Sequence, residues 1–137
     1  MKPTIILICA LSNSKIAFDY FYNLHKKEKI NLLKVYIYKD DITPNKNISL
    51  PLDNIVPSKL LTKVEHINYH KKEIMEINPD FIFVVGWSQL VDKEIAKASK
   101  KGTIGFHTAK LPKDRGRSTI AWQIAEGYNN VLFVRRN

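Results

Sequence analysis

His107 lies where a short apolar run gives way to a basic loop. Ile104 and Phe106 precede it as the expected inward side chains of a strand, and Pro112 prevents the loop from continuing as a helix. Ligands of open α/β sheets bind at the carboxyl ends of strands, and this pattern predicts such a position for His107. Because an imidazole has an ordinary pKa of about 6.5, we expect His107 to exchange protons near neutrality.

The loop after His107 is strongly basic. Its cations fall within eight positions and are Lys110, Lys113, Arg115 and Arg117. Guanidinium and ammonium groups at this density suit the phosphate or carboxylate groups of a ligand. A solvated basic loop is the alternative, just as a hydrogen-bonded structural histidine is the alternative for His107.

The rest of the chain alternates between strand and helix patterns. This alternation predicts an α/β fold with a Rossmann-like, mostly parallel sheet and helices on both faces. The strand that ends at residue 85 is the strongest, and Gly86 directly after it permits a turn into a second carboxyl-end loop. We expect strands at residues 4–10, 32–38, 62–67, 80–85 and 131–134, a further strand that ends at His107, and helices at 15–27, 69–78, 93–101 and 119–126.

Side-chain periodicity adds finer expectations about the helices. Asn68 and Asp92 precede helical patterns and are predicted to cap them. His25 lies off the apolar stripe of the first helix, so we expect it on the surface. That stripe consists of Ile16, Tyr20, Phe21 and Leu24.

Composition limits the class of protein. The chain has 137 residues, 45% of them hydrophobic, which predicts one domain with a substantial core. The net charge of +9 favours anionic partners. The lysines are scattered and no aromatic residues alternate with them, so nucleic-acid binding is the least favoured of the functions considered. His66 and His70 lack further ligands at suitable spacing, so no metal is expected.

The first apolar run bears on the compartment. It contains Cys9, the only cysteine, so no internal disulfide can form and a buried thiol in a reducing compartment is expected. Its seven apolar residues fall well below the roughly 20 that span a bilayer, so we predict a first strand and a cytoplasmic protein without a membrane partner.

The sequence around His107 resembles a known signature. Gly105-Phe-His-Thr-Ala-Lys-Leu-Pro-Lys-Asp-Arg-Gly116 is similar to the motif of folate-dependent formyltransferases, which has Asn-x-His, then Ser-Leu-Leu-Pro, then Arg-Gly. The His, Leu-Pro and Arg-Gly match in spacing. The resemblance implies a Rossmann-like catalytic domain that transfers a formyl group from 10-formyltetrahydrofolate to a primary amine, without a metal.

The resemblance also implies roles for individual residues. His107 would be catalytic, and the pterin would lie along the second loop, with Trp87 as one wall of its slot or only an aromatic plug at the end of the sheet. The implied folate-binding residues are Gly86, Trp87, Ser88, Gln89 and Leu90, and the implied substrate-binding residues are Lys110, Arg115 and Arg117.

This sequence departs from the family pattern at two places. The family has an Asn two residues before the His, where this chain has Gly105 without a side-chain donor. The family also has an Asp a few tens of residues after the His, and this sequence stops at Asn137 before that position. The resemblance is lost after Gly127. We therefore expect residues 1–137 to form a single catalytic domain that is incomplete at its C-terminus.

Several substrates fit the resemblance. The segments 86–90 and 116–119 lean toward enzymes that formylate an amino sugar on a nucleotide, and this acceptor is expected first. Methionyl-tRNA is the alternative acceptor, and it would make tRNA a partner. A further alternative is a catalytically inactive remnant that still binds folate or a nucleotide. The sequence makes no prediction about oligomeric state.

Overall fold

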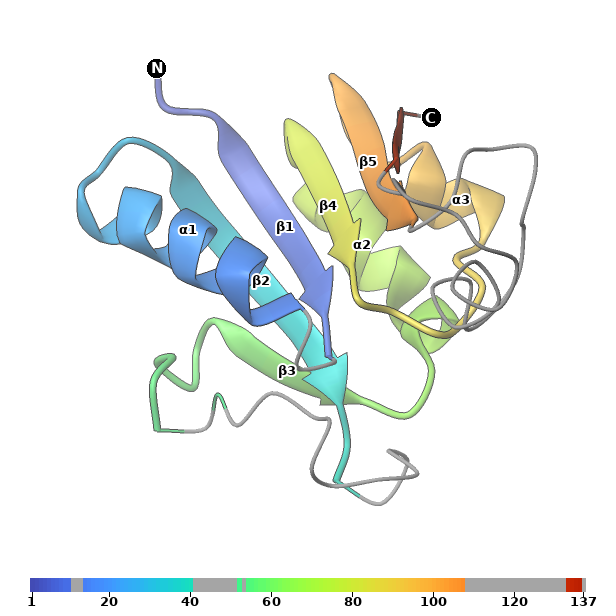
Figure 1. The fold of residues 1–137 in the computed structure, drawn as a ribbon. Coiled ribbons are helices and arrows are strands. Elements are labelled where there is room, and N and C mark those ends of the chain that lie inside the picture. Colours follow the sequence, from blue (N-terminus) through green and yellow to red (C-terminus); the bar gives the residue numbers. More distant parts are fainter. Residues whose placement is uncertain (11–13, 41–51, 53, 108–132, 137) are drawn as a thin grey trace, which may run out of the picture.

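The described part of the chain forms one six-stranded sheet with helices on both faces (Figure 1). The computed structural model describes residues 1–10, 14–40, 52, 54–107 and 133–136. The strand order is β3-β2-β1-β4-β5-β6. The strands are β1 (Thr4–Cys9), β2 (Asn31–Tyr38), β3 (Leu61–Val64), β4 (Phe81–Val85), β5 (Gly102–His107) and β6 (Phe133–Arg136), and the helices are α1 (Lys15–Lys26), the 3-10 helix η3 (Ile67–His70), α2 (Lys71–Ile77) and α3 (Lys93–Ala96).

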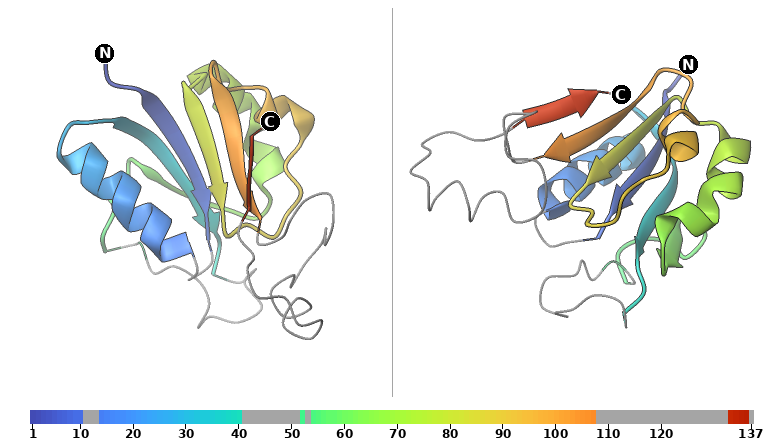
Figure 2. Two further views of the ribbon diagram at one scale, coloured as in Figure 1. Left: turned by 45° about the horizontal axis from the view of Figure 1, so that its top comes forward. Right: turned by 90° about the vertical axis from the view of Figure 1, so that its right-hand side faces the viewer.

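The central strand β1 is buried on both faces because each face is covered by helices. Its odd-numbered side chains, such as Leu7, pack with the residues of α1 in one core cluster. Its even-numbered side chains, such as Ile6, pack with α2 and α3 in a second cluster. Figures 1 and 2 show α1 on one face and α2 and α3 on the other. Burial on both faces requires an uninterrupted apolar strand. The mostly parallel sheet with helices on both faces confirms the predicted fold class.

The inward face of α1 differs from the expected stripe. Phe18 and Phe21 are buried, whereas Ile16 is 85% exposed and Tyr20 is also exposed. Apolar side chains occur almost all around this helix, so their spacing alone did not identify the buried face. The buried face is the one from which Phe18 and Phe21 pack on the sheet. The prediction for His25 was also wrong: it is half-buried, and its Nδ1 accepts the N–H of Leu32 (3.1 Å).

The helices on the other face are shorter than expected. The segment after β3 begins with η3, and Asn68 lies inside it instead of capping a helix. Helix α3 ends at Ala96, several residues before the predicted end. Asp92 does precede α3, but its carboxylate makes no capping hydrogen bond and pairs instead with the Nζ of Lys71 (3.1 Å). This ion pair raises the pKa of Lys71.

The sheet is parallel except at β6. Strand β6 pairs with β5 in the antiparallel direction, so the regular alternation of parallel strands does not extend to this edge (Figure 2). Within β5, Thr103 is buried, whereas Phe106 is 38% exposed. The prediction that Phe106 points into the core was therefore wrong. The predicted helix at 119–126 and most of the loop at 40–59 lie outside the described residues.

Two expectations about the first strand can be compared with the structure. Cys9 is fully buried, and burial raises the pKa of its thiol to about 12, which agrees with a core cysteine. Among the described residues, no helix has the length and apolar character needed to cross a membrane.

A reciprocal pair of hydrogen bonds joins the amino ends of β1 and β4. The Thr4 N–H donates to the Asp80 carboxylate (2.9 Å), and the Thr4 hydroxyl oxygen accepts the Asp80 N–H (2.8 Å). The bond from the Thr4 backbone lowers the pKa of Asp80, and the charges of Lys101 and Lys100 add to the effect.

The lowered pKa of Asp80 predicts a pH-dependent stability. A carboxylate whose pKa is lower in the folded chain stabilises the fold above its unfolded pKa and loses that contribution as pH falls through the folded pKa. We expect Asp80→Asn to lower the urea midpoint at pH 7, and the difference from wild type to shrink as pH falls below about 4.

The matched control is Asp19→Asn, which removes an exposed carboxylate paired with Lys15 and should change the midpoint little. An Asp80→Asn difference that stayed constant down to pH ~2.5 would contradict the assigned charge effect.

Candidate functional site

The carboxyl ends of the parallel strands meet at one edge of the sheet. In the register, Cys9 of β1 lies opposite Val85 of β4, and Val84 of β4 lies opposite Gly105 of β5. Gly86 lies two residues after Val84, and His107 lies two residues after Gly105, the residue paired with Val84. Gly86, the first residue after β4, and His107, the last residue of β5, therefore lie at the same level of neighbouring strands.

Gly86 makes that turn possible. Its φ is 59°, in the left-handed region that costs other residues energy because of their Cβ. Gly105, in contrast, has no positive φ, and a Cβ added there would meet no described atom within 4 Å. The two glycines at this edge thus have different roles: only Gly86 is required by the backbone conformation.

Tyr38 at the end of β2 holds the turn from the side. Its hydroxyl oxygen accepts the backbone N–H of Ser88 (3.0 Å) and that of Gln89 (3.2 Å), and it shares a further hydrogen bond with the Ser88 hydroxyl (2.8 Å). The Tyr38 side chain is itself buried, with 6% of the residue exposed. One buried oxygen therefore fixes two consecutive residues of the candidate folate loop.

Trp87 lies against Tyr38 and the core. The two rings stack with their centroids 4.0 Å apart and an interplanar angle of 24°. Trp87 also packs on the core cluster that contains Ile82 and Ile95. Its indole N–H is buried and has no acceptor among the described residues. These contacts agree with an aromatic plug at the end of the sheet, and a second role as a wall of a ligand slot remains a prediction.

Gln89 and Asn68 anchor the far side of the turn. The Gln89 side-chain oxygen accepts the N–H of Ile67 (3.0 Å), and its side-chain nitrogen donates to the Glu65 carbonyl (2.7 Å). Asn68 donates to the Leu90 carbonyl (3.1 Å) and accepts the N–H of Asp92 (2.9 Å). The segment after β3 and the loop after β4 therefore form one hydrogen-bonded unit.

These hydrogen bonds reduce the number of polar groups of the turn that a ligand could bind. The N–H groups of Ser88 and Gln89 and the side-chain amide of Gln89 already have partners within the chain. Leu90, in contrast, is 89% exposed and covers the outside of the turn. The residues chosen from the sequence are thus joined in one structure, but Ser88 and Gln89 have internal roles that sequence reasoning missed.

Tyr38 and Asn68 were also missed as site residues. Each contacts the turn from a segment more than twenty positions away, so no local pattern identified them. The available signal was a tyrosine near the carboxyl end of a buried strand, where its polar tip needs a partner.

Other predicted site residues lie partly or wholly outside the described residues. Lys110, Arg115 and Arg117 are outside them, and His107 is described only as the last residue of β5. Within the described ranges, no group of three or more His, Cys, Asp or Glu side chains is arranged to hold a metal ion.

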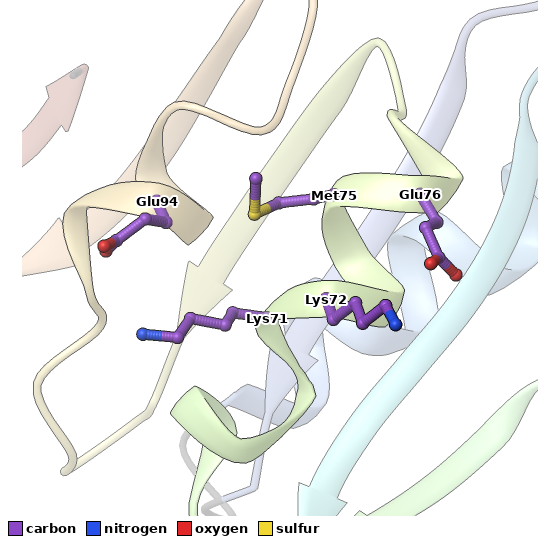
Figure 3. A pocket seen from close by; sticks show the side chains of 5 residues that line it. All are labelled: Lys71, Lys72, Met75, Glu76 and Glu94. Atoms are coloured by element: carbon purple, nitrogen blue, oxygen red, sulfur yellow. The ribbon is translucent and has the colours of Figure 1, made fainter.

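A surface groove lies between α2 and α3. Its volume is about 430 Å³ (Figure 3). Met75 points from α2 toward α3 in this view. The charged side chains around the groove are of both signs, so they favour neither an anion nor a cation. Its lining consists of Lys71, Lys72, Met75, Glu76 and Glu94.

Fold and site together define an α/β domain that presents a rigid turn and a histidine-bearing strand at the carboxyl edge of its sheet. A sequence model described as formyl transferase matches residues 8–131. Since this match covers most of the chain, the chain belongs to the formyl transferase family.

Individual relatives agree with this assignment. The methionyl-tRNA formyltransferase of Clostridium tetani is 38% identical over 102 residues, which cover 70% of this chain and 32% of the relative. The methionyl-tRNA formyltransferase of Thermodesulfovibrio yellowstonii is 37% identical over 65 residues, covering 47% of this chain and 21% of the relative. The chain thus spans about a third or less of the length of these relatives.

Solved structures support the fold. A 4-N formyltransferase from Francisella tularensis has a TM-score of 0.70 at 10% identity, with 98% of this chain and 50% of that chain covered. A phosphoribosylglycinamide formyltransferase from Bacillus halodurans has a TM-score of 0.68 at 12% identity, with 97% and 71% covered. At these identities the likeness concerns the fold alone.

The two edge glycines give a paired stability test. We expect Gly86→Ala to lower the free energy of unfolding by about 1 kcal/mol, because alanine is strained at positive φ. Gly105→Ala should leave it unchanged or raise it by up to about 1 kcal/mol, because it restricts the unfolded chain without strain. Urea unfolding measures both, and equal losses in the two variants would contradict the different roles assigned to these glycines.

Proposed function

We propose that this chain supplies the folate-binding and catalytic part of a formyltransferase that uses 10-formyltetrahydrofolate as its one-carbon donor. The observation that carries the proposal is that Gly86, directly after β4, and His107, at the end of β5, lie at the same level of neighbouring strands. Membership of the formyl transferase family supports the reaction class. We expect this reaction in the cytoplasm, in keeping with a single, buried cysteine, Cys9.

The reaction defines what the site must provide. The acceptor amine attacks the formyl carbon, a tetrahedral carbon with a developing oxyanion forms, and the bond from that carbon to the folate nitrogen breaks. The proton lost by the amine is finally taken up by the folate nitrogen. We assign the transfer of this proton to His107, whose imidazole can both accept and donate it near neutral pH.

The turn from Gly86 to Leu90 is the proposed folate-binding segment. A reduced pterin carries an amino group and a ring N–H as donors, and main-chain carbonyls are complementary to them. Since the N–H groups of Ser88 and Gln89 already bind Tyr38, we expect the turn to contact the pterin through carbonyl oxygens. Trp87, stacked on Tyr38, would border the slot.

Methionyl-tRNA is the acceptor that the relatives favour. The curated relatives named above are methionyl-tRNA formyltransferases, and they match this chain at 37–38% identity. The +9 net charge suits a polyanionic acceptor, and Lys110, Arg115 and Arg117 are the proposed contacts for its phosphates. This order reverses the sequence-based preference for an amino sugar.

An amino sugar carried on a nucleotide is the second candidate acceptor. Its support is the sequence of segments 86–90 and 116–119 together with the fold of the Francisella tularensis enzyme. Offering both acceptors with labelled 10-formyltetrahydrofolate and following the label separates the two. Folate binding without transfer to either amine would instead select the inactive remnant.

The catalytic assignment is tested at His107. We expect His107→Ala to reduce formyl transfer by about 10²- to 10⁴-fold, the usual contribution of a general acid or base, while the Kd for folate measured by calorimetry changes little. His25→Ala is the control, since His25 binds the Leu32 N–H near the amino end of β2 and should not affect transfer. Transfer by His107→Ala at the wild-type rate would refute the role of this imidazole.

The missing side-chain donor is tested at Gly105. Because a Cβ at this position meets no described atom within 4 Å, Gly105→Asn should fold normally. If the oxyanion lacks a donor there, the new amide should raise the rate of transfer by about tenfold to a hundredfold. Gly105→Ala fills the same space without a donor, so equal rates for the Asn and Ala variants would show that the donor role is not vacant.

A further inference from the structure

Tyr38 connects two segments that the sheet keeps apart. It belongs to β2, whereas the turn it binds follows β4, and β1 lies between these strands in the sheet. The hydrogen bonds to Ser88 and Gln89 span 50 and 51 positions of sequence. The side chain therefore reaches past the end of the central strand to the loop beyond it.

We propose that Tyr38 is a positioning residue for the folate-binding turn. This inference rests on the proposed function, because it concerns how the turn presents itself to the ligand. Tyr38 acts through the turn and is assigned no contact with the reacting atoms.

The hydrogen bonds of the Tyr38 hydroxyl fix the direction of two peptide units in the turn. Two consecutive N–H groups converge on one oxygen, which requires the backbone at Ser88 and Gln89 to curve around the Tyr38 side chain. The same peptide units then have their carbonyl groups directed away from Tyr38, since N–H and C=O of a trans peptide point in opposite directions. By binding these N–H groups, Tyr38 leaves the carbonyl groups of the same peptide units available to a ligand.

The ring of Tyr38 has a separate effect. It stacks on Trp87, so the residue that begins the turn after Gly86 is held by packing while the next two are held by hydrogen bonds. Removing only the hydroxyl should therefore take away the acceptor of the Ser88 and Gln89 N–H groups without releasing Trp87. Tyr38→Phe makes this change and keeps the stacked ring.

Tyr36 provides a matched control on the same strand. It is fully buried two residues before Tyr38, and its hydroxyl donates to the carboxylate of Glu73 on α2. Tyr36→Phe thus removes a buried tyrosine hydroxyl that contacts a helix instead of the turn. A general loss of stability would appear in both variants, whereas a loss of turn geometry would appear only in Tyr38→Phe.

The experiment compares wild type, Tyr38→Phe and Tyr36→Phe by amide hydrogen exchange and folate binding. In Tyr38→Phe we expect the amides of Ser88 and Gln89 to exchange about tenfold faster or more, while those of Ile6 and Ile8 in β1 keep their protection. The Kd for 10-formyltetrahydrofolate should rise about tenfold, equivalent to about 1.4 kcal/mol.

Transfer kinetics supply the readout that a merely structural role would not affect. We expect the KM for the folate to rise in Tyr38→Phe while kcat stays within about threefold of wild type, because the turn binds the folate equally in the ground state and in the transition state. Tyr36→Phe should keep the wild-type KM. Wild-type folate affinity in Tyr38→Phe, or the same rise in Kd in both variants, would overturn the inference.

Failure of the proposed function has a different signature. In that case the wild-type chain itself would not bind folate, and Tyr38 could not affect folate affinity. The exchange of the Ser88 and Gln89 amides would still decide whether Tyr38 fixes the turn.

Discussion

The burial of β1 on both faces is the constraint on which the rest of this structure depends. Its side chains alternate between two core clusters, and its backbone pairs with β2 on one side and with β4 on the other. Polar ligand-binding groups cannot lie along such a strand without losing their hydration. They are therefore confined to the edge where the parallel strands end, and the turn after β4 lies beside the end of β5 there.

The turn after β4 is held in place by side chains from distant segments instead of by its own sequence alone. Gly86 allows the reversal, Tyr38 binds two of its N–H groups, and Asn68 and Gln89 tie it to the segment after β3. Such a turn would need little reordering if it bound a ligand, and this would lower the entropic cost of binding. A rigid turn beside a histidine-bearing strand suits a reaction in which two substrates must be aligned.

The sequence predicted the fold well because apolar runs and turn residues are local signals. The strands at residues 4–10 and 80–85 and the position of Gly86 were predictable for this reason. The buried face of α1 was not, since apolar residues surround that helix and only packing of Phe18 chose between faces. The anchoring of the candidate site by Tyr38 also escaped prediction, because it depends on which strands become neighbours in space.

The central claim is that the turn after β4 and the end of β5 form one folate-binding site. Backbone amide NMR of the labelled chain during titration with 10-formyltetrahydrofolate tests it most directly. The account predicts concerted, saturable shifts at Gly86, Leu90 and His107, with the α2–α3 groove residue Met75 unchanged. Shifts confined to that groove, or absent from the turn at saturating folate, would contradict it.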